Sequence, residues 1–155
     1  MEDAIRALTA PEVATVLAPL VRVTEVRAIA PDEHWLSPCR RLSGTPESPS
    51  PSSEPCVGLH FTWMHDLEGV HMKGLPAVLH AIKELRPVPH LGKVAGLHDA
   101  EVGRMYEERT AGGVSRFARL RNRFDPKGTF VNEFLAGFLE GASASGGTNP
   151  SSEEL

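Results

Sequence analysis

The sequence predicts an α+β fold in which an antiparallel sheet is covered by helices, and three observations support this class. Segments 21–30 and 56–63 alternate with the period of two that is typical of strands. Helical periodicity precedes the first of them and follows the second. The order of elements is helix, strand, long loop, strand and then helices, without an internal repeat, and this order is typical of α+β proteins.

Two short helices are predicted at the start of the chain. Residues 2–9 place Ile5 and Leu8 on one side, and Pro11 begins a second helical stretch that reaches Leu20. The first strand follows at once.

The first strand, 21–30, divides its side chains between two faces. Glu25 and Arg27 are two residues apart and therefore lie side by side on one face, whereas Thr24, Val26 and Ala28 point the other way. The sequence therefore predicts a polar face next to an apolar one.

The second strand, 56–63, shows the same division more strongly. One face carries large apolar side chains that should pack into a core: Val57, Leu59, Phe61 and Trp63. The other face carries small or polar residues: Cys56, Gly58, His60 and Thr62. A strand of this kind suits the floor of a polar cavity.

The segment between the strands is predicted to be a disordered surface loop. Of the 13 residues from Ser43 to Pro55, nine are Ser or Pro, which favour neither strand nor helix. An interdomain linker is the alternative, but only about 40 residues precede it, too few for an independent core. A disordered tail is predicted over 141–155, where seven of 15 residues are Gly or Ser.

The second half of the chain is predicted to be mainly helical. Residues 66–69 should form a turn, 71–86 a helix stopped by Pro87 and Pro89, and 89–93 an extended piece that presents His90 or Lys93 at its end. Further helices are predicted at 99–109 and 114–124, and Phe130, Phe134 and Phe138 recur on a short terminal helix.

Length and composition favour one domain with a real core, because 41% of the 155 residues are hydrophobic. The net charge of −4 gives no reason to expect a nucleic acid as partner. One basic stretch is a local exception: Arg116, Arg119, Arg121 and Arg123. It is either the solvated side of an amphipathic helix or a face that docks on an acidic or phosphate-bearing partner.

The sequence gives no signal for secretion, membrane insertion or metal binding. The acidic start Met1-Glu2-Asp3 is followed by no apolar run of signal-peptide type, and no run of 18 apolar residues exists. A cytoplasmic protein with reduced Cys39 and Cys56 is the simplest expectation. None of the seven histidines has the paired spacing that a zinc site needs.

Taken singly, the polar residues have ordinary explanations. Glu25 and Arg27 could form a surface pair worth under ~1 kcal/mol, and His60, Thr62 and Lys93 could simply face water. The occurrence of all these residues together in one sequence is more informative than any one of them alone.

Five motifs occur together in the order and spacing of one enzyme group. They are Thr24-Glu25-Val26-Arg27, Trp35-Leu36-Ser37-Pro38, His60-Phe61-Thr62-Trp63, Pro89-His90-Leu91-Gly92-Lys93, and Asp125-Pro126-Lys127-Gly128 through Phe130, Asn132 and Leu135. With them, residues 1–140 resemble part of the C-terminal substrate (cap) domain of FAD-linked alditol (xylitol) oxidases. These enzymes share that domain with D-arabinono-1,4-lactone and L-gulonolactone oxidases of the vanillyl-alcohol oxidase superfamily.

The resemblance implies an FAD-dependent oxidase that acts on sugar alcohols or aldonolactones and produces hydrogen peroxide. It implies catalytic roles for Glu25, Arg27 and Lys93, and polyol binding by these three with His60 and Thr62. It also implies cofactor contacts for Lys93, His90 and Asn132. A carboxylate that accepts hydrogen bonds beside cations that donate them suits a ligand rich in hydroxyls.

The chain departs from this pattern in two ways. It contains no Gly-rich phosphate loop, so the FAD-binding domain is expected to be absent and the isolated chain to be inactive. Leu91 stands where the family usually has tryptophan. The alternative is a non-catalytic remnant or an interaction module that pairs with a separate FAD domain in cis or in trans.

Overall fold

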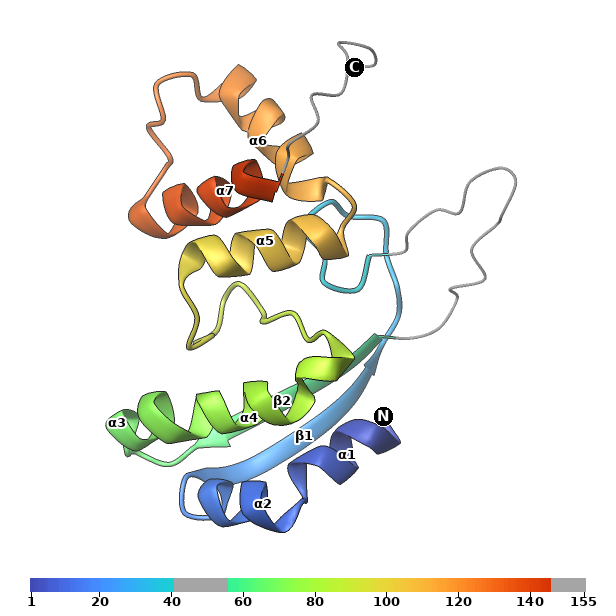
Figure 1. Cartoon of the computed structure of the whole chain (residues 1–155). Coiled ribbons are helices and arrows are strands. Elements are labelled where there is room, and N and C mark those ends of the chain that lie inside the picture. The colour runs from blue at the N-terminus through green and yellow to red at the C-terminus, as the bar shows by residue number, and fades with distance from the viewer. Residues whose placement is uncertain (41–55, 146–155) are drawn as a thin grey trace, which may run out of the picture. The chain divides into compact units, whose positions relative to one another are not determined.

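A computed structural model describes residues 1–40 and 56–145, which form two compact units (Figure 1). The first unit holds residues 1–32 and 56–96, and the second holds 33–40 and 97–145. The predicted Ser/Pro loop, 43–55, lies outside the described residues.

The first unit is built on a two-stranded antiparallel sheet, as the sequence predicts. Strand β1 (Val21–Ile29) pairs with β2 (Cys56–Trp63). The register sets Glu25 opposite His60 and Arg27 opposite Gly58, with an irregularity between Val21 and Val23. Directly paired residues share a face, so the two polar faces predicted from the alternation form one surface.

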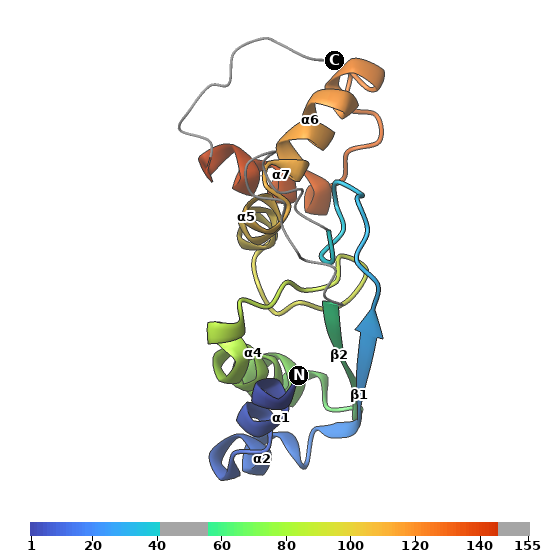
Figure 2. The same ribbon diagram turned by 90° about the vertical axis from the view of Figure 1, so that its right-hand side faces the viewer.

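Helices cover one face of this sheet (Figure 2). They are α1 (Glu2–Leu8), α2 (Pro11–Leu17), α3 (Leu67–Gly69), the π-helical turn η1 (Val70–Gly74), α4 (Leu75–Ile82) and the 3₁₀ turn η2 (Lys83–Leu85). The core contains Leu17, Val78 and Ile82, packed against Leu59, Phe61 and Trp63 of β2. The apolar face predicted for the second strand is therefore confirmed for these three side chains.

The helical segment after β2 starts earlier than predicted. Residues 66–69 are not a separate turn, because Asp66 is the N-cap of α3 and its Oδ1 accepts a hydrogen bond from the Gly69 amide at 2.9 Å. A carboxylate at this position satisfies an amide that the helix leaves unpaired. Gly74 lies against Trp63, where a Cβ would be 2.7 Å from the indole ring. Glycine thus lets the helical segment approach the sheet closely.

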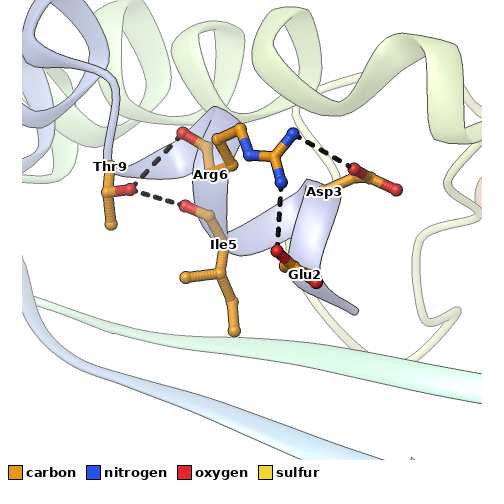
Figure 3. Close-up of polar contacts among 5 residues, drawn as sticks. All are labelled: Glu2, Asp3, Ile5, Arg6 and Thr9. Atoms are coloured by element: carbon orange, nitrogen blue, oxygen red, sulfur yellow. Dashed lines mark hydrogen bonds and ion pairs between the residues drawn. The ribbon is translucent and has the colours of Figure 1, made fainter.

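Helix α1 carries surface ion pairs that have little energetic weight. Arg6 lies 3.1 Å from Glu2 and 3.8 Å from Asp3, and Thr9 Oγ1 donates to the Ile5 carbonyl at 2.8 Å (Figure 3). All three charged side chains are largely exposed. Such pairs typically contribute under ~1 kcal/mol, so this cluster is a solvated helix surface.

The second unit consists of three helices and the segment 33–40. The helices are α5 (Asp99–Arg109), α6 (Gly113–Phe124) and α7 (Glu133–Ser145). Tyr106 and Phe138 are both 1% exposed and meet edge to face with centroids 5.6 Å apart. Arg109 Nε and an Arg40 guanidinium nitrogen donate to the carbonyls of Pro38 and Thr110, which ties the segment to α5.

Two predictions about the end of the chain need correction. Helix α7 continues to Ser145, so residues 141–145 belong to a helix and not to a disordered tail. Gly141 is buried, and a Cβ there would lie 1.8 Å from the Ala100 carbonyl oxygen. Glycine at position 141 therefore allows α7 to pack closely against α5. Phe130 lies outside α7, in the turn that precedes it, so the three phenylalanines do not share one helix.

Neither Cys39 nor Cys56 is a free thiol in the structure, so the expectation of reduced cysteines is wrong. No helix among the described residues is long and apolar enough to cross a membrane.

Candidate functional site

The polar face of the sheet brings three predicted site residues together. One guanidinium nitrogen of Arg27 donates a hydrogen bond to Glu25 Oε2. His60 Nδ1 lies 3.7 Å from the same oxygen, across the strand pair. The alternation of the strands places these side chains on one face, and the antiparallel register sets the imidazole beside the carboxylate.

The cluster is partly open to solvent. The side chains of Glu25, His60 and Arg27 are 40%, 43% and 62% exposed. In Figure 2 the helices of the first unit all lie on the opposite side of the sheet, so no described helix of this unit covers the cluster. The three side chains can therefore contact a ligand or another polypeptide.

Electrostatics keep Glu25 ionised. The hydrogen bond from Arg27 lowers the pKa of Glu25 most, and the charge of Arg27 lowers it next. Desolvation raises this pKa by less than either, and the charge and hydrogen bond of His60 each add a still smaller lowering. A carboxylate whose pKa lies below its ordinary value is a hydrogen-bond acceptor at neutral pH and not a proton donor.

Thr62 lies on the same strand as His60, two residues further on. It is exposed, and its cross-strand partner is Val23. The strand period therefore places its hydroxyl on the face that holds His60, as the sequence predicts.

Apolar side chains stand at both ends of this polar face, and the sequence reasoning missed them. Val23 and Ile29 belong to the same alternation as Glu25 and Arg27, and they are 45% and 41% exposed. The Ile29 side chain lies over Gly58, because a Cβ on Gly58 would be 2.9 Å from Ile29 Cδ1. The alternation of β1 was a readable signal that Val23 and Ile29 share the face of Glu25 and Arg27.

His90 and Lys93 lie in an irregular turn and not in an extended element. The Lys93 amide donates to the His90 carbonyl at 3.0 Å, and the Gly92 amide donates to His90 Nδ1 at 3.0 Å. Both residues are exposed. Among residues 1–40 and 56–145, no hydrogen bond or ion pair joins either side chain to the Glu25 cluster.

Asn132 belongs to the second unit and has a structural partner there. Its Oδ1 accepts a hydrogen bond from the Leu135 amide at 2.8 Å and so caps the start of α7. The carboxamide nitrogen remains as a donor. The structure therefore accounts for Asn132 as a helix cap.

The described residues offer no metal centre. In the two described ranges, no group of three or more His, Cys, Asp and Glu side chains could hold a metal ion.

Comparison with known proteins finds a matching family model and matching curated relatives. The family model described as D-arabinono-1,4-lactone oxidase matches residues 2–137. Alditol oxidase from Streptomyces sp. (strain IKD472 / FERM P-14339) is 34% identical over 128 residues, which cover 81% of this chain. No solved structure matches the chain.

The match covers the two proteins unequally, since the aligned part is 26% of the alditol oxidase. The chain thus spans about a quarter of the length of that relative. The family match nevertheless runs through both units and includes the sheet, the turn at 89–93 and the start of α7. The chain belongs to the D-arabinono-1,4-lactone oxidase family.

Proposed function

We propose that this chain carries the substrate-binding face of an FAD-dependent oxidase that acts on sugar alcohols or aldonolactones, with oxygen as electron acceptor and hydrogen peroxide as product. The observation that supports this most strongly is the cluster of Glu25, Arg27 and His60 on the uncovered face of the sheet. Family membership and the name of the alditol oxidase relative support the class of reaction.

A polyol or a lactone presents several hydroxyl groups, each of which is a donor and an acceptor. The ionised Glu25 carboxylate accepts hydrogen bonds from them, and the exposed part of the Arg27 guanidinium donates to them. His60 and Thr62 extend the polar surface along β2. Because Glu25 is held by Arg27, the two groups meet the substrate in a fixed arrangement, which lowers the entropic cost of binding.

FAD, when bound, supplies the acceptor for the hydride that leaves the substrate carbon. The residues of this chain fit a supporting role toward it, because the cluster face is open, cationic at Arg27 and bordered by apolar Val23 and Ile29. In this proposal Lys93 contacts both substrate and cofactor, and His90 and Asn132 contact the cofactor. Positive charge near the ring favours the negative charge that the reduced cofactor carries.

Most contacts to FAD come, in this proposal, from a part of the oxidase outside these 155 residues, in cis or in trans. The proposal predicts that the chain supplies binding and orientation of the substrate, and that a complete enzyme needs the remaining part of the family's chain. The match to only a quarter of the relative supports this division.

A hybrid oxidase tests the function. In it, the segment of the Streptomyces alditol oxidase that aligns with this chain is replaced by residues 2–137. Peroxide formation is measured with xylitol and with D-arabinono-1,4-lactone. We expect turnover of at least one substrate and a loss of about 100-fold or more in kcat/KM for Glu25→Gln, because a charge-assisted contact to the reacting substrate is removed.

The matched control is Glu84→Gln, which makes the same chemical change at an 88% exposed side chain of the same unit. It should leave kcat/KM unchanged. Equal activity of the Glu25→Gln and Glu84→Gln hybrids would contradict the proposed site.

A further inference from the structure

We propose that the end of α6 and the turn after it form a docking surface for the remainder of the oxidase, the part of the family's chain that residues 2–137 do not match. This inference rests on the proposed function. We name this region the Phe124–Phe130 surface; it consists of Phe124 and Phe130 with the basic residues Arg116, Arg119, Arg123 and Lys127.

Two phenylalanines of this surface are more exposed than a folded protein normally allows. Phe124 is 74% exposed and Phe130 is 84% exposed, whereas Phe138 on α7 is 1% exposed. A single exposed apolar residue is ordinary, but two largely exposed phenylalanines on one helix end and the turn after it favour an interaction site.

Hydrogen bonds to Asp125 fix the backbone of the turn that carries Phe130. Asp125 follows Phe124, and its carboxylate accepts hydrogen bonds from the Thr129 amide at 2.7 Å and from the Phe130 amide at 2.9 Å. The Gly128 amide donates to the Asp125 carbonyl at 3.1 Å and closes the turn. Asp125 itself is only 8% exposed.

This arrangement brings Phe130 next to the end of α6 and limits the motion of its backbone. A turn whose backbone is already fixed loses little backbone entropy on binding, and aromatic residues dominate the energy of many interfaces. The turn is therefore built to present Phe130 and is not a flexible connection.

The charge around the rings identifies the character of the occupant. Helix α6 contains no acidic residue, and Arg116, Arg119 and Arg123 are exposed at helical spacing, with Lys127 in the turn. In the part of the chain that the structure describes, no carboxylate forms an ion pair with these four cations. The Arg123 guanidinium lies 5.6 Å from the centre of the Phe124 ring. The surface thus fits an apolar patch with an acidic border.

Among possible occupants, the remainder of the oxidase agrees best with these observations. A symmetric contact between two copies would set the same cations against each other, which is unfavourable. The remainder is large, because the aligned part is 26% of the alditol oxidase, and the surface lies inside the family match. An anionic membrane offers similar chemistry and is an outcome of the test.

The test compares the isolated chain with the hybrid oxidase. The Phe124→Ala/Phe130→Ala double variant should leave the thermal midpoint of the isolated chain within about 1 °C, because the rings are exposed there. It should lower the midpoint of the hybrid by about 3 °C or more, because the rings are buried against the remainder. The matched control is Leu67→Ala, at a 71% exposed apolar position of the first unit, and it should change neither midpoint.

If the hybrid does not give folded protein, the remainder of the Streptomyces enzyme is expressed with a tag beside the separate chain. Wild-type chain should be retained on the tagged remainder, and the double variant should be retained about tenfold less. Failure to retain the wild-type chain, or equal retention of both, overturns the proposal.

Binding of this surface to a different partner would also overturn the proposal. Phe130-dependent sedimentation of the isolated chain with phosphatidylserine vesicles would assign the surface to a membrane, and Phe130-dependent dimers in sedimentation equilibrium would assign it to a second copy. The turnover and thermal-midpoint measurements distinguish failure of this inference from failure of the proposed function. Loss of turnover in Glu25→Gln with no midpoint shift in the double variant would refute the docking surface alone.

Discussion

Replacing Gly103 by alanine tests the packing of α5 against α7, on which the second unit depends. A Cβ at this position would lie 1.9 Å from the Phe138 carbonyl oxygen, whereas real Cβ contacts essentially never fall below 3.0 Å. The obstructing atom belongs to the backbone and cannot rotate away. The two helices must therefore separate by about 1 Å to admit one methyl group.

Two effects of this substitution oppose each other. Alanine has the higher helix propensity, which favours the variant by up to ~1 kcal/mol. Overpacking costs typically ~1–3 kcal/mol, and separation also removes contacts between Tyr106 and Phe138, the two largest fully buried side chains. We expect a net loss of about 2 kcal/mol in the free energy of unfolding of the second unit.

Urea unfolding followed by tryptophan fluorescence measures this loss. Trp35 belongs to the second unit and Trp63 to the first, so a Trp63→Phe background reports on the second unit alone. Gly137→Ala on α7 is the comparison, because its Cβ would meet only the Asp99 side chain, at 3.0 Å or more. Its effect should be much smaller. A Gly103→Ala protein as stable as its parent, or more stable, would refute the packing argument.

Three further predictions concern the site. Arg27→Gln should raise the pKa of Glu25 toward its ordinary value. A lowered carboxyl pKa stabilises the fold while the carboxyl is ionised, and this stabilisation is lost on acidification, so the variant should lose less stability than the parent as the pH falls. An unchanged Glu25 titration by NMR would contradict this. The isolated chain with FAD and xylitol should give no peroxide above a blank, and a clear signal would show that it needs no further domain. Asn132→Ala should destabilise α7 by ~1 kcal/mol in urea unfolding whereas Asn132→Asp should not, and equal loss in both would show that the side chain is more than a cap.

The strands and the composition of their faces were predictable, because a period of two is a strong local signal. Val57 to Trp63 alternates large apolar with small or polar residues, and the core indeed receives Leu59, Phe61 and Trp63. The face that holds Glu25 and Arg27 followed from the same rule.

The pairing of Glu25 with His60 was not predictable in detail. In a hairpin the turn type and loop length fix the register, but here a long segment joins the strands, so the local sequence does not specify which residues pair. The resemblance to a family placed the residues in one site, but only coordinates show that the carboxylate meets both the guanidinium and the imidazole.

The glycines of α7 misled the sequence reasoning for a physical reason. Gly and Ser are typical of disordered tails, and they are also what two helices need in order to approach each other closely. Gly141 lies against Ala100, a residue far away in the sequence, so local composition cannot distinguish the two cases. The turn at 89–93 was equally ambiguous, because Pro89 disfavours a helix without specifying how His90 and Lys93 are presented.

The most direct test of the central claim is a crystal structure of the hybrid oxidase with xylitol bound. We predict hydroxyl oxygens of xylitol at about 2.6–3.2 Å from the Glu25 carboxylate and the Arg27 guanidinium, with His60 and Thr62 on the same face of the sheet. Xylitol bound elsewhere, with the Glu25 cluster facing bulk solvent or covered by protein without ligand, would contradict it.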